Sequence, residues 1–268
     1  MKQQTYQDFH LVLIDDGSTD GTDEMVQDSI SSLTILRGQG DWWWGGSLHQ
    51  GYLWLKAQNL PASAKVLIIN DDALFARTYL ETGITALAHL KRTLLVSVAY
   101  GQIHKQRIDG GVHADWKHWK FTLETDPIKI NCASTRGLFF YVSDFMEIGG
   151  FYPKLLPHYT SDYEFTMRAY RKGFTLLPDE RLILFTDETA SGIYNFKKEI
   201  SYRGFLKNMF SKKYTLNPIY NSYFVALACP WPWKLSNWLL IWSSTAWKIV
   251  RYFFILVIFN KWRKAVKE

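Results

Sequence analysis

The sequence predicts an α/β protein with a mostly parallel sheet flanked by helices, followed by a basic, aromatic helical region. Two observations predict this class. Short, largely apolar runs at residues 11–14 and 65–69 fit buried strands, and each ends abruptly in polar and acidic residues. Segments with apolar residues at helical spacing lie between such runs. Sheets of this kind bind ligands beyond the carboxyl ends of their strands, so functional residues are expected there.

The first strand, residues 11–14, runs into the sequence Asp-Asp-Gly-Ser-Thr-Asp-Gly-Thr. Gly17 and Gly21 permit unusual backbone angles, and the three carboxylates suit cations or sugar hydroxyls. A plain surface turn is one alternative, because Asp-Gly pairs are common in turns. An EF-hand calcium loop is another, but its twelfth position is Gln27 and a strand precedes it. A helix with acids in its first turn is expected next, over residues 23–30.

A second strand is expected at residues 33–36, followed by a glycine-rich loop that contains Trp42, Trp43 and Trp44. Two interpretations of these tryptophans stay open. They form a lid or wall of a sugar pocket, or they are a hydrophobic plug against the C-terminal appendage. A helix over residues 47–57 follows.

The strand at residues 65–69 ends in Asn70, Asp71 and Asp72. Clustered oxygen ligands at a strand end suit a hard divalent cation on a diphosphate. The alternative is a polar strand end without a ligand. A helix over residues 76–90 and a strand over residues 94–100 are expected after it.

Residues 130–141 read as a strand, a tight turn at Arg136 and Gly137, and a second strand. A later helix begins near residue 161, where Thr160 or Ser161 can cap it and Asp162 lies in its first turn. Acidic residues favour helix starts in any case, which is the alternative to a catalytic role. A strand over residues 176–185, with a turn at 178–180, completes this part.

Composition limits the class of protein. Of the 268 residues, 47% are hydrophobic and 21% charged, as in globular proteins. Two cysteines, Cys132 and Cys229, are too few for a disulfide framework, so a reducing, cytosolic location is expected. Residues 195–268 contain thirteen Lys and Arg but only two acidic residues, although the net charge of the whole chain is only +6. This asymmetry disfavours general nucleic-acid binding and favours an anionic partner for the tail.

The tail has a break at residues 231–233 and a helical pattern from Leu235. Its uncharged apolar run is shorter than the about 20 residues that a membrane span needs. Tryptophans, apolar bulk and basic residues together favour a helix lying in an anionic membrane surface. An ordinary helix packed on the catalytic domain is the alternative.

Residues 4–22 resemble the nucleotide-sugar site of glycosyltransferase family 2, whose members have the GT-A fold. Three later stretches resemble motifs of the family and occur in the same order along the chain. Residues 70–72 resemble its Asp-x-Asp motif, and residues 148–152 resemble its Gly-Gly motif. Residues 161–168 resemble its Glu-Asp-x-Asp-Leu-x-x-Arg motif. Asn70 and Ser161 replace acidic residues of these motifs. The chain is most similar to the rhamnosyltransferase-like branch. It begins where the family's first helix ends, so we expect about one βα unit, roughly 30 residues, upstream in the functional protein.

The resemblance implies roles for individual residues. Asp162 is the catalytic base. Asp72, with Asn70, holds Mg²⁺ or Mn²⁺. The register between Asp15 and Asp16 at the nucleotide stays open. The implied donor-binding residues are Asp15, Asp16, Gly17, Ser18, Asp20, Trp44, Gly45, Asp71, Arg136 and Gly137, and the implied acceptor-binding residues are Tyr163 and Glu164.

The resemblance also implies a function. The chain is expected to be an inverting hexosyltransferase that uses a dTDP- or UDP-sugar, with rhamnose the favoured sugar. Its acceptor is a saccharide, lipid-linked in bacterial surface polysaccharide synthesis at the inner membrane face. Two alternatives stay open: a non-catalytic nucleotide-sugar or saccharide-binding protein or inactive fragment, and a membrane-surface adaptor that uses only the tail. The expected domains are residues 1–195, with a nucleotide-sugar part (1–110) and an acceptor part (111–195), and the tail, 196–268.

Overall fold

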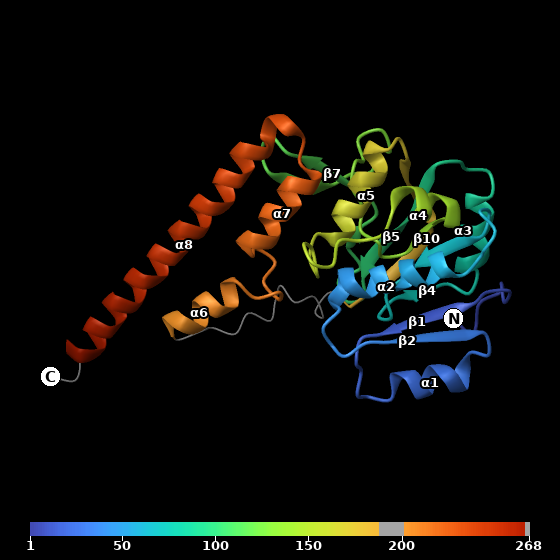
Figure 1. Cartoon of the computed structure of the whole chain (residues 1–268), viewed down its shortest axis with the longest axis horizontal. Coiled ribbons are helices and arrows are strands. Elements are labelled where there is room, and N and C mark those ends of the chain that lie inside the picture. Colours follow the sequence, from blue (N-terminus) through green and yellow to red (C-terminus); the bar gives the residue numbers. More distant parts are fainter. Residues whose placement is uncertain (188–200, 266–268) are drawn as a thin grey trace. The chain divides into compact units, whose positions relative to one another are not determined.

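A computed structural model describes residues 1–187 and 201–265, with side chains up to residue 256. The chain divides into two compact units, Met1–Thr189 and Ala190–Glu268 (Figure 1). The boundary predicted after residue 195 lies outside the described residues.

The first unit alternates strands and helices. Its strands are β1 (Leu11–Asp15), β2 (Leu33–Arg37), β3 (Lys65–Ile68), β4 (Leu74–Phe75), β5 (Thr93–Gly101), β6 (Arg107–Asp109), β7 (Val112–Asp115), β8 (Lys120–Leu123), β9 (Leu138–Tyr141) and β10 (Thr175–Thr186). Its helices are α1 (Thr22–Ser29), α2 (Trp43–Ala57), α3 (Tyr79–Leu87), α4 (Val142–Ile148) and α5 (Ser161–Arg171).

The main sheet has six strands in the order β3-β9-β5-β10-β4, with β6 beside β5. Strand β9 is antiparallel to both of its neighbours, and β5 pairs with β10 in parallel. Strands β3, β5 and β10 therefore run the same way, and their polar ends meet at one edge. The sheet is mixed rather than mostly parallel, because the tight turn at residues 136–137 sends β9 back between β3 and β5.

Strands β1 and β2 form a separate parallel pair, in register from Leu11 opposite Leu33 to Asp15 opposite Arg37. The sequence predicts burial of residues 11–14 on both faces, but all four are only half-buried. Among the described residues, β1 pairs with β2 alone, so one of its edges has no neighbouring strand. Helix α2 lies against this pair, with Gly51 next to the Ile14 side chain.

Successive residues of β9 point to opposite faces of the sheet. Phe140 lies in a core cluster with α2, α4 and α5, whereas Phe139 lies in a second cluster with Tyr79 and Leu87 of α3. The sheet is thus covered by helices on both faces, which brings the starts of α2 and α5 to the same side.

Three local predictions differ from the structure. Helix α2 begins at Trp43 rather than at residue 47, because the Asp16 carboxylate accepts hydrogen bonds at its start. Residues 130–134 form no strand, and Cys132 makes an isolated bridge to Val112. Strand β10 runs through the predicted turn with a bulge between Asp179 and Ile183.

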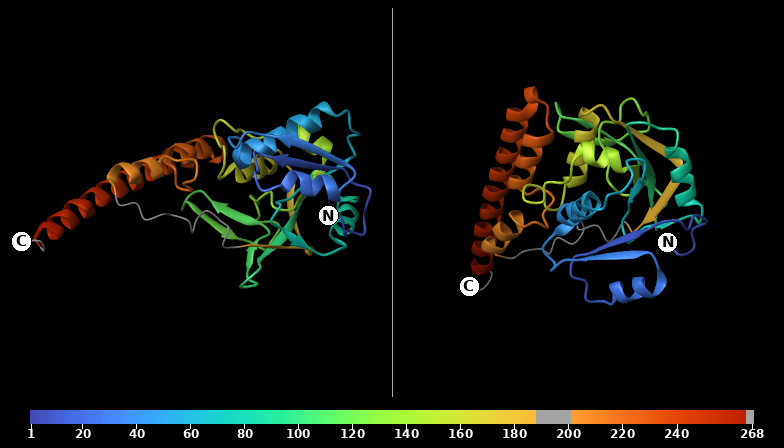
Figure 2. Two further views of the ribbon diagram at one scale, coloured as in Figure 1. Left: turned by 90° about the horizontal axis from the view of Figure 1, so that it is seen from below. Right: turned by 45° about the vertical axis from the view of Figure 1, so that its right-hand side comes forward.

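The second unit consists of α6 (Tyr202–Met209), α7 (Pro218–Ala228) and the 35-residue α8 (Trp231–Ala265). Figure 2 shows α8 as one unbroken helix. The predicted break at residues 231–233 is the first turn of α8, where proline is tolerated because its missing N–H has no helical partner there. Both shorter helices pack on α8: Trp242 Nε1 donates to Ser222 Oγ at 3.0 Å, and the Phe205 and Tyr252 rings stack 4.0 Å apart.

Candidate active site

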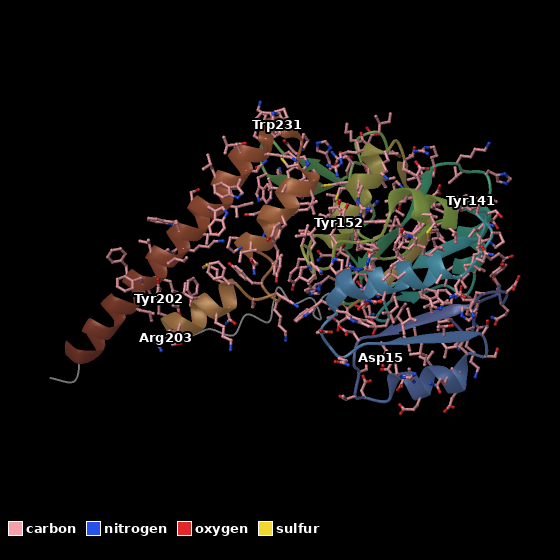
Figure 3. All side chains as sticks on the ribbon, viewed as in Figure 1. Asp15, Tyr141, Tyr152, Tyr202, Arg203 and Trp231 are labelled. Atoms are coloured by element: carbon pink, nitrogen blue, oxygen red, sulfur yellow. The ribbon has the colours of Figure 1, made fainter. Side chains whose placement is uncertain are left out.

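The loop after β1 holds the first acidic pair. Asp15, at the end of β1 (Figure 3), is buried, and its Oδ1 accepts a hydrogen bond from Ser18 N at 2.9 Å. Asp16 accepts from Gly40 N and Trp43 N, both at 2.9 Å, with one oxygen each. Asp15 thus closes its own turn, while Asp16 anchors the start of α2.

Glycine is required where this loop meets the loop after β2. Gly17 has φ +84°, and a Cβ there would lie 2.9 Å from Gly40 N. The two other predicted residues of the loop, Ser18 and Asp20, are exposed. Asp20 Oδ1 accepts from Thr22 N at 3.1 Å and Thr22 Oγ1 at 2.6 Å, and these bonds lower the pKa of Asp20. Asp20 therefore holds the turn before α1, and its predicted donor contact stays a prediction.

The tryptophan segment forms the first turn of α2. Trp44 packs against the core cluster on the α2 face of the sheet rather than forming a lid. Gly45 N donates to Pro157 O at 2.8 Å, and a Cβ on Gly45 would overlap the Leu156 carbonyl oxygen. The predicted donor role of Gly45 is therefore replaced by a packing role: α2 directly touches the segment that leads into α5.

Asp162 lies in the first turn of α5, directly after Thr160 and Ser161. Thr160 has φ +63°, a strained angle of the kind that gathers at functional sites. Asp162 Oδ1 accepts from its neighbour's backbone, Tyr163 N, at 2.9 Å. Burial raises the pKa of Asp162 to about 6, and the charge of Asp109 acts in the same direction. The residue as a whole is half-buried.

Arg136 connects Asp162 with the end of β3. Burial raises the pKa of both Asp72 and Asp162, and the positive charge of Arg136 opposes this increase in each, so both carboxylates lie within the electrostatic influence of one guanidinium. Arg136 Nε is buried and, among the described residues, has no hydrogen-bond partner. Gly137 follows with φ +72°, and a Cβ there would lie 2.6 Å from Tyr79 Oη. The tight turn therefore needs glycine to deliver Arg136 to this position.

The residues after β3 were tested for their fit to a divalent cation. Within residues 1–187 and 201–256, no group of three or more His, Cys, Asp or Glu side chains is placed to hold a metal. However, Asn70 Oδ1 is buried without a partner there, and Asp71 and Asp72 are exposed beside it. Partial desolvation raises the pKa of Asp72. Mg²⁺ commonly takes one or two carboxylates and draws its other ligands from substrate phosphates. The donor set fits such a shared site.

A series of contacts and charge interactions links the three acidic clusters within the first unit. Asp16 holds the start of α2, whose Gly45 touches the residues that lead into α5. Asp162 follows in α5, and Arg136 joins it to Asp72.

Comparison with known proteins identifies the family. A sequence profile of glycosyl transferase family 2 matches residues 1–145, more than half of the 268-residue chain. The chain belongs to glycosyltransferase family 2. The family predicted from residues 4–22 and the later motifs is thereby confirmed.

A solved structure supports the fold of this glycosyltransferase. The mannosyltransferase PcManGT from Pyrobaculum calidifontis, solved with GDP-Man and Mn²⁺, is similar over 99% of this chain and 76% of its own, with 15% identity and a TM-score of 0.53. S. aureus TarS gives 16% identity over 84% of this chain and 38% of its own, with a TM-score of 0.48. No curated protein matches the sequence. The predicted α/β, GT-A-type fold is confirmed.

Asp109 is a site residue of this glycosyltransferase that the sequence patterns did not single out. It ends β6, is 7% exposed, and accepts from Gly110 N at 2.8 Å and from Ser134 Oγ. Ser134 Oγ in turn accepts from Arg136 N at 3.3 Å. Asp109 is thus a second carboxylate beside Asp162. The Asp-Gly-Gly sequence at the end of a short strand was the available signal.

His158 was also missed by sequence analysis. Its Nδ1 is buried and has no partner among the described residues, and burial lowers the pKa of the ring. The ring lies 5.4 Å from that of Trp43, which has the strained φ of +58°. A neutral imidazole therefore lies between the starts of α2 and α5. No spacing in the sequence pointed to it.

The two predicted acceptor residues of the glycosyltransferase differ in surroundings. Tyr163 stacks on Phe121, with ring centroids 6.0 Å apart, and burial raises the pKa of its hydroxyl. Glu164 is 2% exposed, and its carboxylate binds Arg168 with Nη2 at 2.9 Å. Arg168 also donates to Ile148 O at 2.7 Å and Gly150 O at 2.8 Å. Glu164 therefore holds the fold together, and its predicted acceptor role does not fit.

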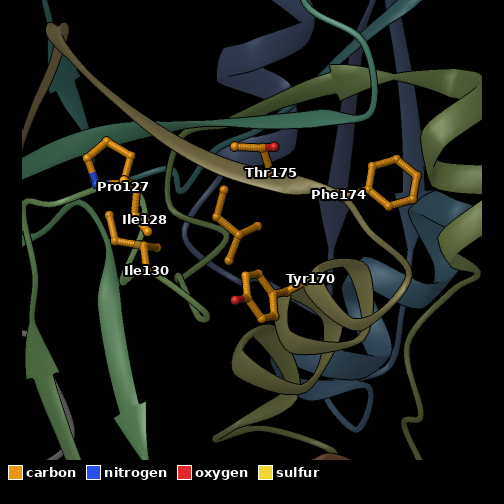
Figure 4. Close-up of a pocket in the computed structure, with 7 residues that line it drawn as sticks. Pro127, Ile128, Ile130, Tyr170, Phe174 and Thr175 are labelled. Atoms are coloured by element: carbon orange, nitrogen blue, oxygen red, sulfur yellow. The ribbon is translucent and has the colours of Figure 1, made fainter.

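An apolar groove of about 310 Å³ lies at the other end of α5 (Figure 4). Its lining comes from the last turn of α5, the first residues of β10 and the loop before β9: Pro127, Ile128, Ile130, Tyr170, Phe174, Thr175 and Leu176. Since Asp162 lies in the first turn of α5 and Tyr170 in the last, this groove is separate from the acidic site.

Proposed function

We propose that this glycosyltransferase transfers a hexose from a nucleoside diphosphate donor to a saccharide hydroxyl with inversion at the anomeric carbon. One observation carries the proposal: the Asp162 carboxyl has a pKa of about 6 and, like Asp72, lies within the electrostatic influence of Arg136. A base with a pKa near the working pH is the kind that proton transfer needs.

The proposed reaction is a single displacement at the anomeric carbon of the donor sugar. The acceptor hydroxyl oxygen forms a bond to the anomeric carbon while the bond from that carbon to the diphosphate oxygen breaks. Asp162 takes the hydroxyl proton, and the nucleoside diphosphate leaves with the bonding electron pair. Attack from the face opposite the leaving group inverts the anomeric centre.

The donor diphosphate is assigned to the Asp72 side of the site. Asp72 and Asn70, with Asp71 beside them, would hold Mg²⁺ or Mn²⁺, and PcManGT was solved with Mn²⁺. When bound, the cation supplies positive charge that stabilises the leaving diphosphate. Arg136 contributes a fixed positive charge from the protein at the same place. A dTDP- or UDP-sugar, with rhamnose favoured, stays our proposal for the donor.

For the acceptor we propose a lipid-linked saccharide of bacterial surface polysaccharide synthesis, used at the inner face of the membrane. Support comes from the aromatic surroundings of Asp162, since Tyr163 and Phe121 offer the flat apolar surfaces that sugar rings pack on. The apolar outer surface of α8 suits an enzyme whose acceptor is anchored in lipid.

The test combines a screen of nucleotide sugars with Asp162→Asn. The wild-type chain with Mn²⁺ is expected to release nucleoside diphosphate from one donor and to transfer its sugar. The variant should lose about 10²- to 10⁴-fold in transfer because the base is gone, while donor binding by calorimetry stays. Asp144→Asn is the matched control, because Asp144 is also a buried carboxylate in a helix first turn. Full transfer activity in Asp162→Asn would remove the base assignment.

The fold of the variant is checked by its stability. Because its pKa is raised, ionised Asp162 lowers the stability of the folded protein. This loss is complete above about pH 6 and absent below the usual aspartate pKa of 3.8. Asp162→Asn should therefore raise the free energy of unfolding at neutral pH by on the order of 1–3 kcal/mol, and the unfolding temperature with it. This gain in stability should vanish near pH 4. Lost activity in a more stable variant excludes misfolding as the cause.

A non-catalytic nucleotide-sugar-binding protein is the second candidate. It is favoured by the amide of Asn70 and the hydroxyl of Ser161 at positions where the family has acids. Donor turnover with Mn²⁺ separates the two, because a binding protein raises the unfolding temperature with donor but releases no nucleoside diphosphate.

A further inference from the structure

Helix α8 is long and apolar enough to cross a lipid bilayer. The qualifying segment is Trp231–Leu256, 26 residues, of which only 11% of the most apolar stretch is buried within the protein. At 1.5 Å per residue this is about 39 Å, compared with about 30 Å of hydrocarbon in a bilayer. The run predicted to be too short is the uncharged one, which Lys234 and Lys248 still bound; the qualifying segment is longer because it includes these two cations and Arg251.

The polarity of α8 is inverted relative to a helix of a water-soluble bundle. Its buried stripe includes Asn237, 3% exposed, and Thr245, 5% exposed. Asn237 Nδ2 contacts Cys229 Sγ at 3.6 Å, and Thr245 Oγ1 donates to Ile241 O at 2.7 Å. The outward side carries large apolar side chains, including Trp231 at its first residue (Figure 3): Trp231, Leu235, Leu239, Trp247, Val250 and Phe254, each between 45% and 85% exposed. Polar groups are thus paired inside and apolar groups face out.

Charge is nearly absent from α7 and the first half of α8. Between residues 214 and 247 the only charged side chain is Lys234, and its Nζ donates to Ala226 O at 2.7 Å, in the last turn of α7. That bond satisfies both the ammonium and a helix-end carbonyl. The other basic residues of the unit precede α7 or lie in the second half of α8 and after it: Lys197, Lys198, Arg203, Lys207, Lys212, Lys213, Lys248, Arg251, Lys261, Arg263, Lys264 and Lys267.

We propose that the outward side of α8 is buried in the hydrocarbon of an anionic lipid membrane. A bilayer fits better than a protein partner, because large exposed apolar side chains recur from Trp231 to Ile255, and the charged residues described in α8, Lys234, Lys248 and Arg251, are all basic. The basic residues of the unit match an anionic headgroup layer. This inference stands independently of the proposed transferase reaction.

Vesicle flotation of the full chain tests the proposal. The wild-type chain should float with vesicles of phosphatidylcholine and phosphatidylglycerol. Leu239→Glu combined with Val250→Glu places two carboxylates on the outward side and should lower the floated fraction at least tenfold. Ile128→Glu is the matched control: this side chain is 88% exposed in the first unit, and its variant should float like the wild type. Equal flotation of all three proteins would overturn the proposal.

Spin labels then report what covers the surface. Cysteines at positions 239 and 250 can be labelled selectively, because Cys132 and Cys229 are buried at 0% and 1% exposure. With vesicles, both labels should become accessible to oxygen and protected from a water-soluble nickel complex, while a label at Lys207→Cys stays accessible to nickel. Protection without vesicles, together with a doubled mass in sedimentation, would instead show a second copy on this surface and overturn the proposal. Donor turnover in solution is measured in parallel, so a failed membrane test leaves the transferase proposal to its own result.

Discussion

The surroundings of Asp162 shift the pKa of its carboxyl group in opposite directions. Burial and the neighbouring Asp109 charge favour its protonated form, whereas the Tyr163 N–H and the Arg136 charge favour the ionised form. The balance is a pKa of about 6. Asp109 touches Ser134 and, through it, the Arg136 backbone, so the same network sets both the charge and the position of the groups around the base.

We expect Asp109→Asn to shift the acidic limb of the pH–rate profile of transfer to lower pH. The base works only when ionised, so the rate should fall as pH drops through about 6 in the wild type. Removing the Asp109 charge lowers the pKa of Asp162, and the acidic limb of the pH–rate profile therefore moves to lower pH. Asp115→Asn removes an exposed carboxylate that pairs with His118 and should leave the limb in place. An unmoved limb in Asp109→Asn would contradict the electrostatic role.

At the scale of elements, the site depends on how closely α2 approaches the start of α5. The Asp16 carboxylate sets where α2 begins, and Gly45 lets it touch the residues before α5. Arg168 fixes the other side of this segment through the Ile148 and Gly150 carbonyls. The active-site geometry is therefore held by packing and backbone contacts rather than by the catalytic side chains themselves.

Gly45→Ala should loosen this junction. The added methyl group overlaps the Leu156 carbonyl oxygen, and such overpacking typically costs about 1–3 kcal/mol. We expect a lower unfolding temperature and a fall in transfer activity. Gly51→Ala, in the same helix, meets only the tip of the Ile14 side chain at 2.9 Å and gains up to about 1 kcal/mol of helix propensity. If both variants behaved alike in thermal unfolding, the contact at Gly45 would not be limiting.

For the whole molecule, the distribution of charge separates two tasks. The first unit carries the acidic site, and the region after residue 195 carries thirteen of the 31 basic residues. The inverted polarity of α8 adds an apolar surface to this basic region. The proposed membrane association would therefore have an electrostatic part that salt screens and an apolar part that salt does not screen.

Salt should weaken membrane association only in part. Raising NaCl from about 0.1 M to about 1 M shortens the Debye length from about 10 Å to about 3 Å, which removes the attraction of the cations to anionic headgroups. Apolar burial does not depend on that attraction. The initial rate of vesicle binding should fall severalfold, while chain already bound should stay with the vesicles in flotation. Complete release at about 1 M NaCl would indicate attachment by charge alone.

The sequence by itself determined the family, the main strands and the acidic motifs at their ends. These features are local: apolar runs, turn residues and motif spacing are read within about twenty residues, and Asp16, Asp72 and Asp162 follow from them. Two features of the tail were also readable, its basic excess and its tryptophan-rich helix.

Only the tertiary structure decided what each group faces. Glu164 and Gly45 fitted a binding role in the motif, but contacts with Arg168 and Leu156 from elsewhere in the chain give them packing roles. Asp109 entered the site because β6 and the turn before β9 meet at Ser134. Strand β1 is half-buried because pairing and coverage depend on distant segments. The outward apolar side of α8 likewise follows from which side α7 covers, since periodicity shows that a helix has two faces but not which one is turned inward.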